Sequence, residues 1–168
     1  MKYFTPDLLV RGQSEDPRIA DEVERLWDEA ILRYQSHLDR LRPTFPAGLQ
    51  ALEEHPLHDS LVRIVSKREH ELLIVVQMET ANHEMLHLRF DLAEPPVIHT
   101  ETLPEHLRSE DGTALWLYEE VEQAEVCWRM CILLSNGWEM EICFHDVAVD
   151  AFQALWPSAN VAVSAPPH

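Results

Sequence analysis

Five consecutive residues, His83-Glu84-Met85-Leu86-His87, match the HExxH pattern of zinc peptidases. On a helix, His83 and His87 lie one turn apart and could bind one zinc ion, while Glu84 could activate a water molecule. In an extended strand the same two histidines would stand roughly 13 Å apart, too far for one ion. The pattern therefore predicts a zinc-dependent hydrolase only if residues 80–87 are helical.

The segments on either side of this motif favour strands instead. Leu72–Glu79 and Met85–Leu92 both follow the two-residue period of a strand, and only one helical turn fits between them. Asn82-His83 fits the turn between the two strands. We therefore predict a hairpin without a cofactor, and keep the zinc hydrolase as the alternative interpretation.

Two His-Asp dipeptides, His58-Asp59 and His145-Asp146, each flank a predicted strand. Adjacent side chains of a strand point to opposite faces, so the members of one pair cannot bind one ion unless the strand bulges. A metal or catalytic site would require the two histidines to meet across the sheet. In the structural alternative, His58 caps a strand or bonds to backbone, and His145 packs opposite Trp128.

Other catalytic patterns are absent from the sequence. It contains no GxSxG motif, and its four glycines form no phosphate-binding loop. The three cysteines have no metal-ligand spacing and are typical of small buried side chains in a reducing cytosol. Carboxylate pairs such as Glu53-Glu54 and Glu119-Glu120 indicate a solvated face in so acidic a chain.

The charge of the chain bears on its partners. Thirty acidic against thirteen basic residues give a formal net charge of −17 over 168 residues. Binding to nucleic acid or to an anionic membrane surface needs clustered basic residues, which this chain lacks. We therefore expect no nucleic acid and no membrane as partner. The acidity favours a solvated surface, and the alternative is a basic protein attracted by electrostatic steering.

The segment Met85–Leu92 supplies a candidate binding face. Its apolar side chains at 86, 88, 90 and 92 point one way, as expected of a half-buried strand. The opposite face carries His87, Arg89 and Asp91, and we expect water or a partner to contact it.

The elements that position these residues divide the chain into two parts. From Ile19 onward, apolar residues recur at steps of three and four, which predicts a long amphipathic helix. Asp16-Pro17 supplies its N-cap and first turn, and Arg42-Pro43 ends it. A shorter helix is predicted from Pro46 or Ala47 to Glu54.

After His58 the period changes to two, and about six strands follow. They are predicted at Leu61–Ser66, Leu72–Glu79, Met85–Leu92, Leu115–Glu122, Val126–Ser135 and Trp138–His145. A long loop over 93–112 is expected to include a short strand at Val97–His99 and a helical turn near 104–108. We predict one α+β domain over 1–156, with the helix packed on a mainly antiparallel sheet, and a flexible tail over 157–168.

Asn136-Gly137 predicts a two-residue type I′ turn. That turn would pair Ser135 with Trp138, and would therefore place Leu133 opposite Met140. Both faces of such a hairpin are apolar, so we expect it to be central in the sheet, with the long helix covering its second face.

Several short stretches spread over most of the chain share a pattern. They are Met1-Lys2-Tyr3-Phe4-Thr5, Leu57-His58-Asp59, Tyr118-Glu119-Glu120-Val121 and, following Gly137, Glu139, Ile142 and Phe144. Together they resemble a loosely defined bacterial family of uncharacterised proteins. The resemblance implies a bacterial cytosolic protein with helices followed by a sheet, and it implies no activity, cofactor or catalytic residue.

Three functional hypotheses follow from these observations. The first is a non-enzymatic binding module, such as an inhibitor or immunity-like protein for a basic partner. The second is the zinc hydrolase at residues 83–87, and the third is a small-ligand carrier with a pocket between helix and sheet. The N-terminal residues contain no signal-peptide core, and the longest apolar run, Leu72–Val76, is far too short to span a membrane. We therefore expect a soluble, cytoplasmic protein.

Overall fold

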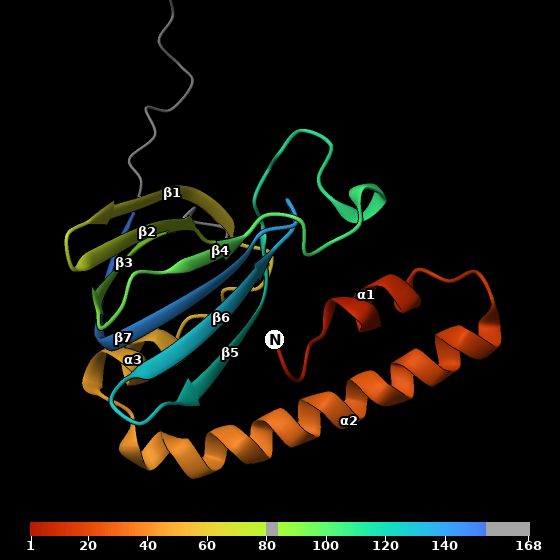
Figure 1. Cartoon of the computed structure of the whole chain (residues 1–168), viewed down its shortest axis with the longest axis horizontal. Helices are drawn as coiled ribbons and strands as arrows, with labels where there is room; N and C mark the ends of the chain where they lie inside the picture. The colour runs from red at the N-terminus through yellow and green to blue at the C-terminus, as the bar shows by residue number, and fades with distance from the viewer. Residues whose placement is uncertain (80–83, 154–168) are drawn as a thin grey trace, which may run out of the picture.

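The computed structural model describes residues 1–79 and 84–153. Its helices are Pro6–Gly12 (α1), Pro17–Leu41 (α2) and Ala47–Glu53 (α3), with 3-10 turns at Arg42–Thr44 and Glu105–Leu107. Its strands are Leu61–Arg68 (β1), Glu71–Gln77 (β2), Glu84–Leu92 (β3), Val97–His99 (β4), Trp116–Gln123 (β5), Trp128–Leu134 (β6) and Glu139–Gln153 (β7). The helices precede the sheet in the chain, and the protein has the predicted α+β fold (Figure 1).

The long helix begins and ends where the sequence predicts. The Asp16 carboxylate accepts the backbone N–H of Arg18 at 2.9 Å, and Pro17 is the first helical residue. The short helix α1 was not predicted, although Thr5-Pro6 places a hydroxyl cap before a proline in the same manner. With seven residues, α1 is too short to show a helical period in the sequence.

All paired strands are antiparallel, in the order β1-β2-β3-β7-β6-β5, with β4 beside β7. At one end the sheet curls until its first and last strands meet. There the backbone N–H of Asp59 donates to Trp116 at 2.9 Å, and that of Val62 donates to Ala114 at 2.8 Å. We call the concave side of the sheet, which contains the main core, the inner face.

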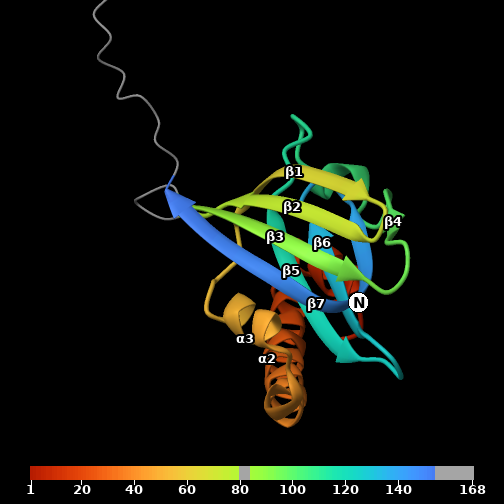
Figure 2. The same ribbon diagram turned by 90° about the vertical axis from the view of Figure 1, so that its left-hand side faces the viewer.

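Strand β7 extends eight residues beyond the predicted end at His145. Its first part pairs with β6 and β4, and its second part pairs with β3 (Figure 2). Strand β6 begins at Trp128, opposite Phe144, so it leaves the later residues of β7 without a neighbour on that side. Helix α3 packs against β7 in this region.

The predicted register of the β6–β7 hairpin is wrong by one residue. The backbone N–H of Leu134 donates to Trp138 at 2.8 Å, and Gly137 adopts a left-handed conformation with φ +86°. The loop therefore holds three residues, with glycine in the position that needs a positive φ, and not two as in a type I′ turn. As a result Leu133 lies opposite Glu139, and Met140 lies opposite Ile132.

This shift exchanges the faces of one strand relative to the other, because side chains alternate with period two. The apolar residues of both strands now share the inner face and belong to the main core: Trp128, Met130, Ile132, Leu134, Met140, Ile142 and Phe144. The outer face instead pairs Leu133 with Glu139 and Cys131 with Glu141. The hairpin therefore has one apolar face and one mixed face, and not two apolar faces as predicted.

Helix α2 packs along the free edge of β5 and not across the second face of the hairpin. Leu38 and Leu41, near its end, pack on the main core, whereas Trp27 and Ala30 belong to a second cluster with Phe4.

Two side chains of α2 also replace the missing neighbour strand of β5. The Tyr34 hydroxyl accepts the backbone N–H of Val121 at 2.9 Å, and His37 Nε2 lies 3.1 Å from the Val121 carbonyl oxygen.

Helix α3 lies unusually close to β7 at Gly48. A Cβ atom at this position would stand 1.5 Å from the carbonyl oxygen of Val147. Any larger residue would push the helix away from the strand. Leu49 and Leu52 on α3 are buried in the main core, so this close approach seals the side of the core that β6 leaves open.

Candidate functional site

The HExxH motif lies largely on a strand. Residues Glu84–His87 belong to β3, whose register places Met85 opposite Gln77 and Phe152. His83 and the predicted Asn82-His83 turn lie outside the described residues. The extended Glu84–His87 segment lacks the helical turn that the zinc interpretation requires. Within residues 1–79 and 84–153, no group of three or more His, Cys, Asp and Glu side chains is placed to hold a metal ion.

The first His-Asp dipeptide breaks the strand alternation. Asp59 adopts a positive φ of 62°, and this turn brings its carboxylate oxygen Oδ2 to 3.5 Å from Nε2 of His58. The other ring nitrogen, Nδ1, lies 2.5 Å from the backbone oxygen of Leu117. His58 therefore bonds to backbone, as in the structural alternative, and its ring also contacts Tyr118 at a centroid distance of 5.2 Å.

The second dipeptide lies inside β7. His145 and Asp146 are exposed, and the Asp146 carboxylate accepts the backbone N–H of Val147 at 2.8 Å. Because of the register shift, Phe144 and not His145 lies opposite Trp128. The first dipeptide bonds to β5 and the second belongs to β7, so β6 lies between the two and they form no common site.

Three acidic residues occupy paired positions on adjacent strands, on the outer face of the sheet. Asp91 on β3 is paired with Glu71 on β2 and with Asp146 on β7. We call these three residues the acidic row. None of them forms an ion pair with another described residue, and like charges in directly opposed positions destabilise a sheet. Arg68 on β1 lies opposite Glu71 in the strand register, so the row borders a basic residue at one end, while Asp91 and Asp146 have acidic cross-strand partners.

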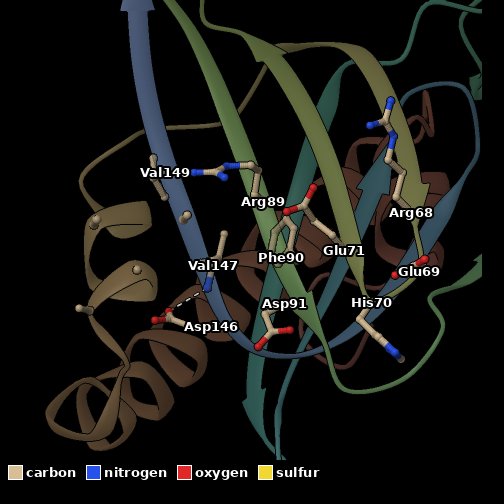
Figure 3. Close-up of a pocket in the computed structure, with 14 residues that line it drawn as sticks. Arg68, Glu69, His70, Glu71, Arg89, Phe90, Asp91, Asp146, Val147 and Val149 are labelled. Carbon is tan, nitrogen blue, oxygen red and sulfur yellow. Dashed lines mark hydrogen bonds between the residues drawn. The ribbon is translucent and has the colours of Figure 1, made fainter.

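A concave surface, which encloses a volume of about 790 Å³, surrounds the acidic row. Figure 3 shows Asp91 between Asp146 and the β1–β2 turn that carries Glu69 and His70. Arg89 also lines this surface, but its guanidinium group is already paired with Asp150 at 3.0 Å. The small side chains of α3 leave its wall open, at Ala47, Gly48 and Ala51.

The third residue of the predicted binding face, His87, lies farther along β3, outside the lining of this surface. Its ring packs edge-on against Phe152, with the ring centroids 4.4 Å apart.

Glu119-Glu120 is not the solvated pair that the sequence predicts. The two residues belong to a second site, which no sequence pattern indicates. A β-bulge between Trp116 and Tyr118 changes the alternation of β5, so that Glu119 follows Trp116 onto the inner face. Glu120 then lies on the outer face, where only 2% of its surface is exposed. Strict alternation from Trp116 would have placed Glu120 on the inner face, and no residue of this stretch announces the bulge.

Glu120 anchors the N-terminal segment. Its carboxylate accepts the backbone N–H groups of Lys2, Tyr3 and Phe4 at 2.6, 2.7 and 2.7 Å. The neighbouring Glu139 pairs with the amino group of Met1 at 2.7 Å. Both carboxylates therefore hold residues 1–4 against the sheet.

Glu119 lines a cavity of about 210 Å³ between α2, α3 and the inner face of β5 and β6. Its Oε2 accepts the indole N–H of Trp116 at 2.7 Å. Burial raises the pKa of the Glu119 carboxyl, and this effect exceeds the opposing effects of the Trp116 hydrogen bond and of His58. The rest of the lining is largely apolar, and its other polar side chains are Tyr34, Glu53 and His55.

A comparison of the chain with protein-family models and with curated protein sequences finds no match. The resemblance noted from the sequence therefore stays an expectation. Among the described helices, none combines the length and the apolar character needed to cross a bilayer.

Proposed function

We propose that the protein is a non-enzymatic interaction module, of the inhibitor or immunity-like kind, that binds a basic partner protein through the concave surface around the acidic row. The observation that carries the proposal is the alignment of Glu71, Asp91 and Asp146 on adjacent strands, where none of the three is within ion-pair distance of a described basic group. Arg68 on β1 lies opposite Glu71 at one end of the row but forms no ion pair with it. A partner that supplies arginine or lysine would relieve this repulsion.

Geometry favours a long basic side chain as the ligand of this surface. Arginine binds carboxylates through two parallel hydrogen bonds, and adjacent carboxylates offer several such acceptors. The open wall of α3 leaves room beside Asp146 for the stem of such a side chain. Two arginines line this surface. Arg89 is paired with Asp150 at 3.0 Å, and Arg68 lies opposite Glu71 on the neighbouring strand.

The overall charge supports the same partner class. A net charge of −17 accelerates the encounter with a basic protein and repels acidic competitors. Steering of this kind weakens with ionic strength, because salt screens charges beyond a Debye length of about 8 Å at physiological salt. Binding should therefore be strong at low salt and decrease steeply as salt is added.

The test compares three baits in a native lysate: wild type, the triple variant E71Q/D91N/D146N, and the control E15Q/D21N/D28N. The control removes the same number of charges from exposed positions on or next to α2. We expect wild type and control to recover the same basic protein in a salt-sensitive manner, and the triple variant to recover roughly tenfold less or below. Calorimetry with the purified partner should reproduce this order.

Two results would contradict the proposal. One is equal recovery by the triple variant and the control, which would assign the binding to overall charge and not to the acidic row. The other is recovery of no basic protein at low salt and high bait concentration. Circular dichroism of each bait establishes that the variants are folded.

A further inference from the structure

The cavity beneath α2 and α3 differs in chemistry from the concave surface on the outer face. Its walls are largely apolar, with Leu38 from α2, Leu49 from α3 and Met130 from β6. A single carboxylate, Glu119, extends into this setting from β5. Glu53 also borders the cavity, but its carboxylate is paired with Arg42 at 3.0 Å.

The hydrogen bonds of Glu119 leave part of its carboxylate available. Trp116 is the one side-chain donor that bonds to it in the described part of the chain, and it contacts Oε2. The Tyr34 hydroxyl, although it lines the same cavity, accepts the backbone N–H of Val121. The backbone N–H of Glu119 also interacts with its own carboxylate. A partly desolvated carboxylate with one side-chain donor gains free energy from a further donor, above all from a cationic one.

The volume of the cavity limits the ligand. An apolar cavity of about 150 Å³ holds one benzene ring. The present cavity of about 210 Å³ has room for a ring with a short chain, or for a branched aliphatic group of similar size. A purely apolar ligand would fill the space but would offer the Glu119 carboxylate no donor beyond those of the protein, so it would gain no hydrogen bond there.

We propose that this cavity binds a small apolar molecule with one cationic amine, whose ammonium group hydrogen-bonds to Glu119 while its hydrocarbon part packs between α2 and α3. The site is separate from the acidic row, since Glu119 lies on the inner face and the acidic row on the outer face. Its occupation would add contacts between α2, α3 and β5, three elements that meet at this cavity.

Titration calorimetry with 2-phenylethylamine and with its neutral counterpart 2-phenylethanol tests the proposal. The matched variants are Glu119→Gln, the exposed control Glu125→Gln, and Leu38→Trp, which fills the cavity. We expect one amine per protein chain, and roughly tenfold weaker binding of the alcohol. Glu119→Gln should weaken the amine by a similar factor and leave the alcohol unchanged, whereas Glu125→Gln should alter neither.

A second measurement remains informative if Leu38→Trp does not fold. In the wild type, the indole N–H signal of Trp116 in a nitrogen–proton NMR spectrum should shift as the amine is added, because Trp116 and the ligand share one carboxylate. Equal affinity of the amine for wild type and Glu119→Gln would overturn the proposal. So would an unmoved Trp116 signal at saturation, or the absence of saturable binding by the wild type.

Discussion

Glu119 and Glu120 are neighbours on β5, yet their surroundings are opposite. Glu120 accepts three backbone N–H groups and is closed off by the second aromatic cluster, which includes Tyr3 and Phe4. Glu119 accepts one indole N–H and lies beside a cavity. Glu120 is buried and fully engaged by backbone donors, whereas the half-buried Glu119 has one side-chain donor and borders a cavity. The comparison indicates that the surroundings of a carboxylate, more than its place in the sequence, determine its role.

The same contrast extends to the two sides of β5. On the outer side, residues 1–4 pack against the strand and cover Glu120. On the inner side, α2 and α3 diverge above Glu119 and leave a gap in the main core. Backbone groups of the chain therefore cover Glu120 on the outer side, whereas a cavity remains beside Glu119 on the inner side.

The largest expected effect on stability comes from Glu120, the carboxylate that anchors the N-terminal segment. Glu120→Gln removes the charge from three hydrogen bonds and turns amide hydrogens toward backbone donors. Because bonds to charged groups contribute about 1.5–3 kcal/mol each and do not add fully, we expect the free energy of unfolding to fall by about 3–5 kcal/mol. Urea denaturation measures this loss.

Glu122→Gln on the same strand is the control for this loss. Among the described residues, its carboxylate pairs with the exposed Lys2 at 3.4 Å, so the expected change is about 0.5 kcal/mol or less. Similar losses in the two variants would contradict the role assigned to Glu120.

An intermediate effect on stability is expected at Gly48, where α3 contacts β7. Gly48→Ala places a methyl group against the carbonyl oxygen of Val147, so α3 must move away from β7. We expect a loss of about 2 kcal/mol, typical of overpacking, in thermal or urea unfolding. Gly12→Ala is the control, because a methyl group there meets only Val23 at 3.6 Å and should leave stability nearly unchanged. A neutral Gly48→Ala would show that α3 is not seated as described.

The smallest effect is a pH dependence of the stability that arises from Glu119. Burial raises the pKa of Glu119 above its unfolded value, so the native state holds this proton more tightly than the unfolded state does. The ionised carboxyl therefore lowers stability as pH rises through the native pKa, and this cost disappears at pH values below the unfolded pKa.

Glu119→Gln should accordingly gain stability relative to the wild type between pH 4 and pH 7. Urea unfolding of both proteins across this range measures the difference, and we expect it to be smaller than the effect of Glu120→Gln. A difference that is constant with pH, or that changes in the opposite direction, would contradict the assigned environment.

Sequence patterns were sufficient where one local signal decided the structure. Asp16-Pro17 marked the start of α2, and the apolar alternation of Met85–Leu92 marked the inner face of β3. Patterns failed where one residue changed a register. The left-handed Gly137 shifted the β6–β7 pairing, and the bulge after Trp116 exchanged the faces of the residues that follow.

The candidate sites follow the same division. Arg89, Asp91 and Asp146 were singled out from alternation or from a dipeptide, and the structure brings all three into the lining of one concave surface. Glu71 joins them only through strand pairing, which no local pattern contains. To predict the Glu119 site, both the bulge and the positions of two helices would have to be known. Residue spacing does not reveal such long-range packing.

The bonds from Tyr34 and His37 to Val121 give α2 a protective role. These side chains satisfy a backbone donor and acceptor that would otherwise be available to the strands of other molecules. Detachment of α2 would expose a bare strand edge, the surface through which separate chains join into intermolecular sheets. The helix thus disfavours self-association through the edge of β5. Mutations that weaken its packing should therefore cause the protein to aggregate.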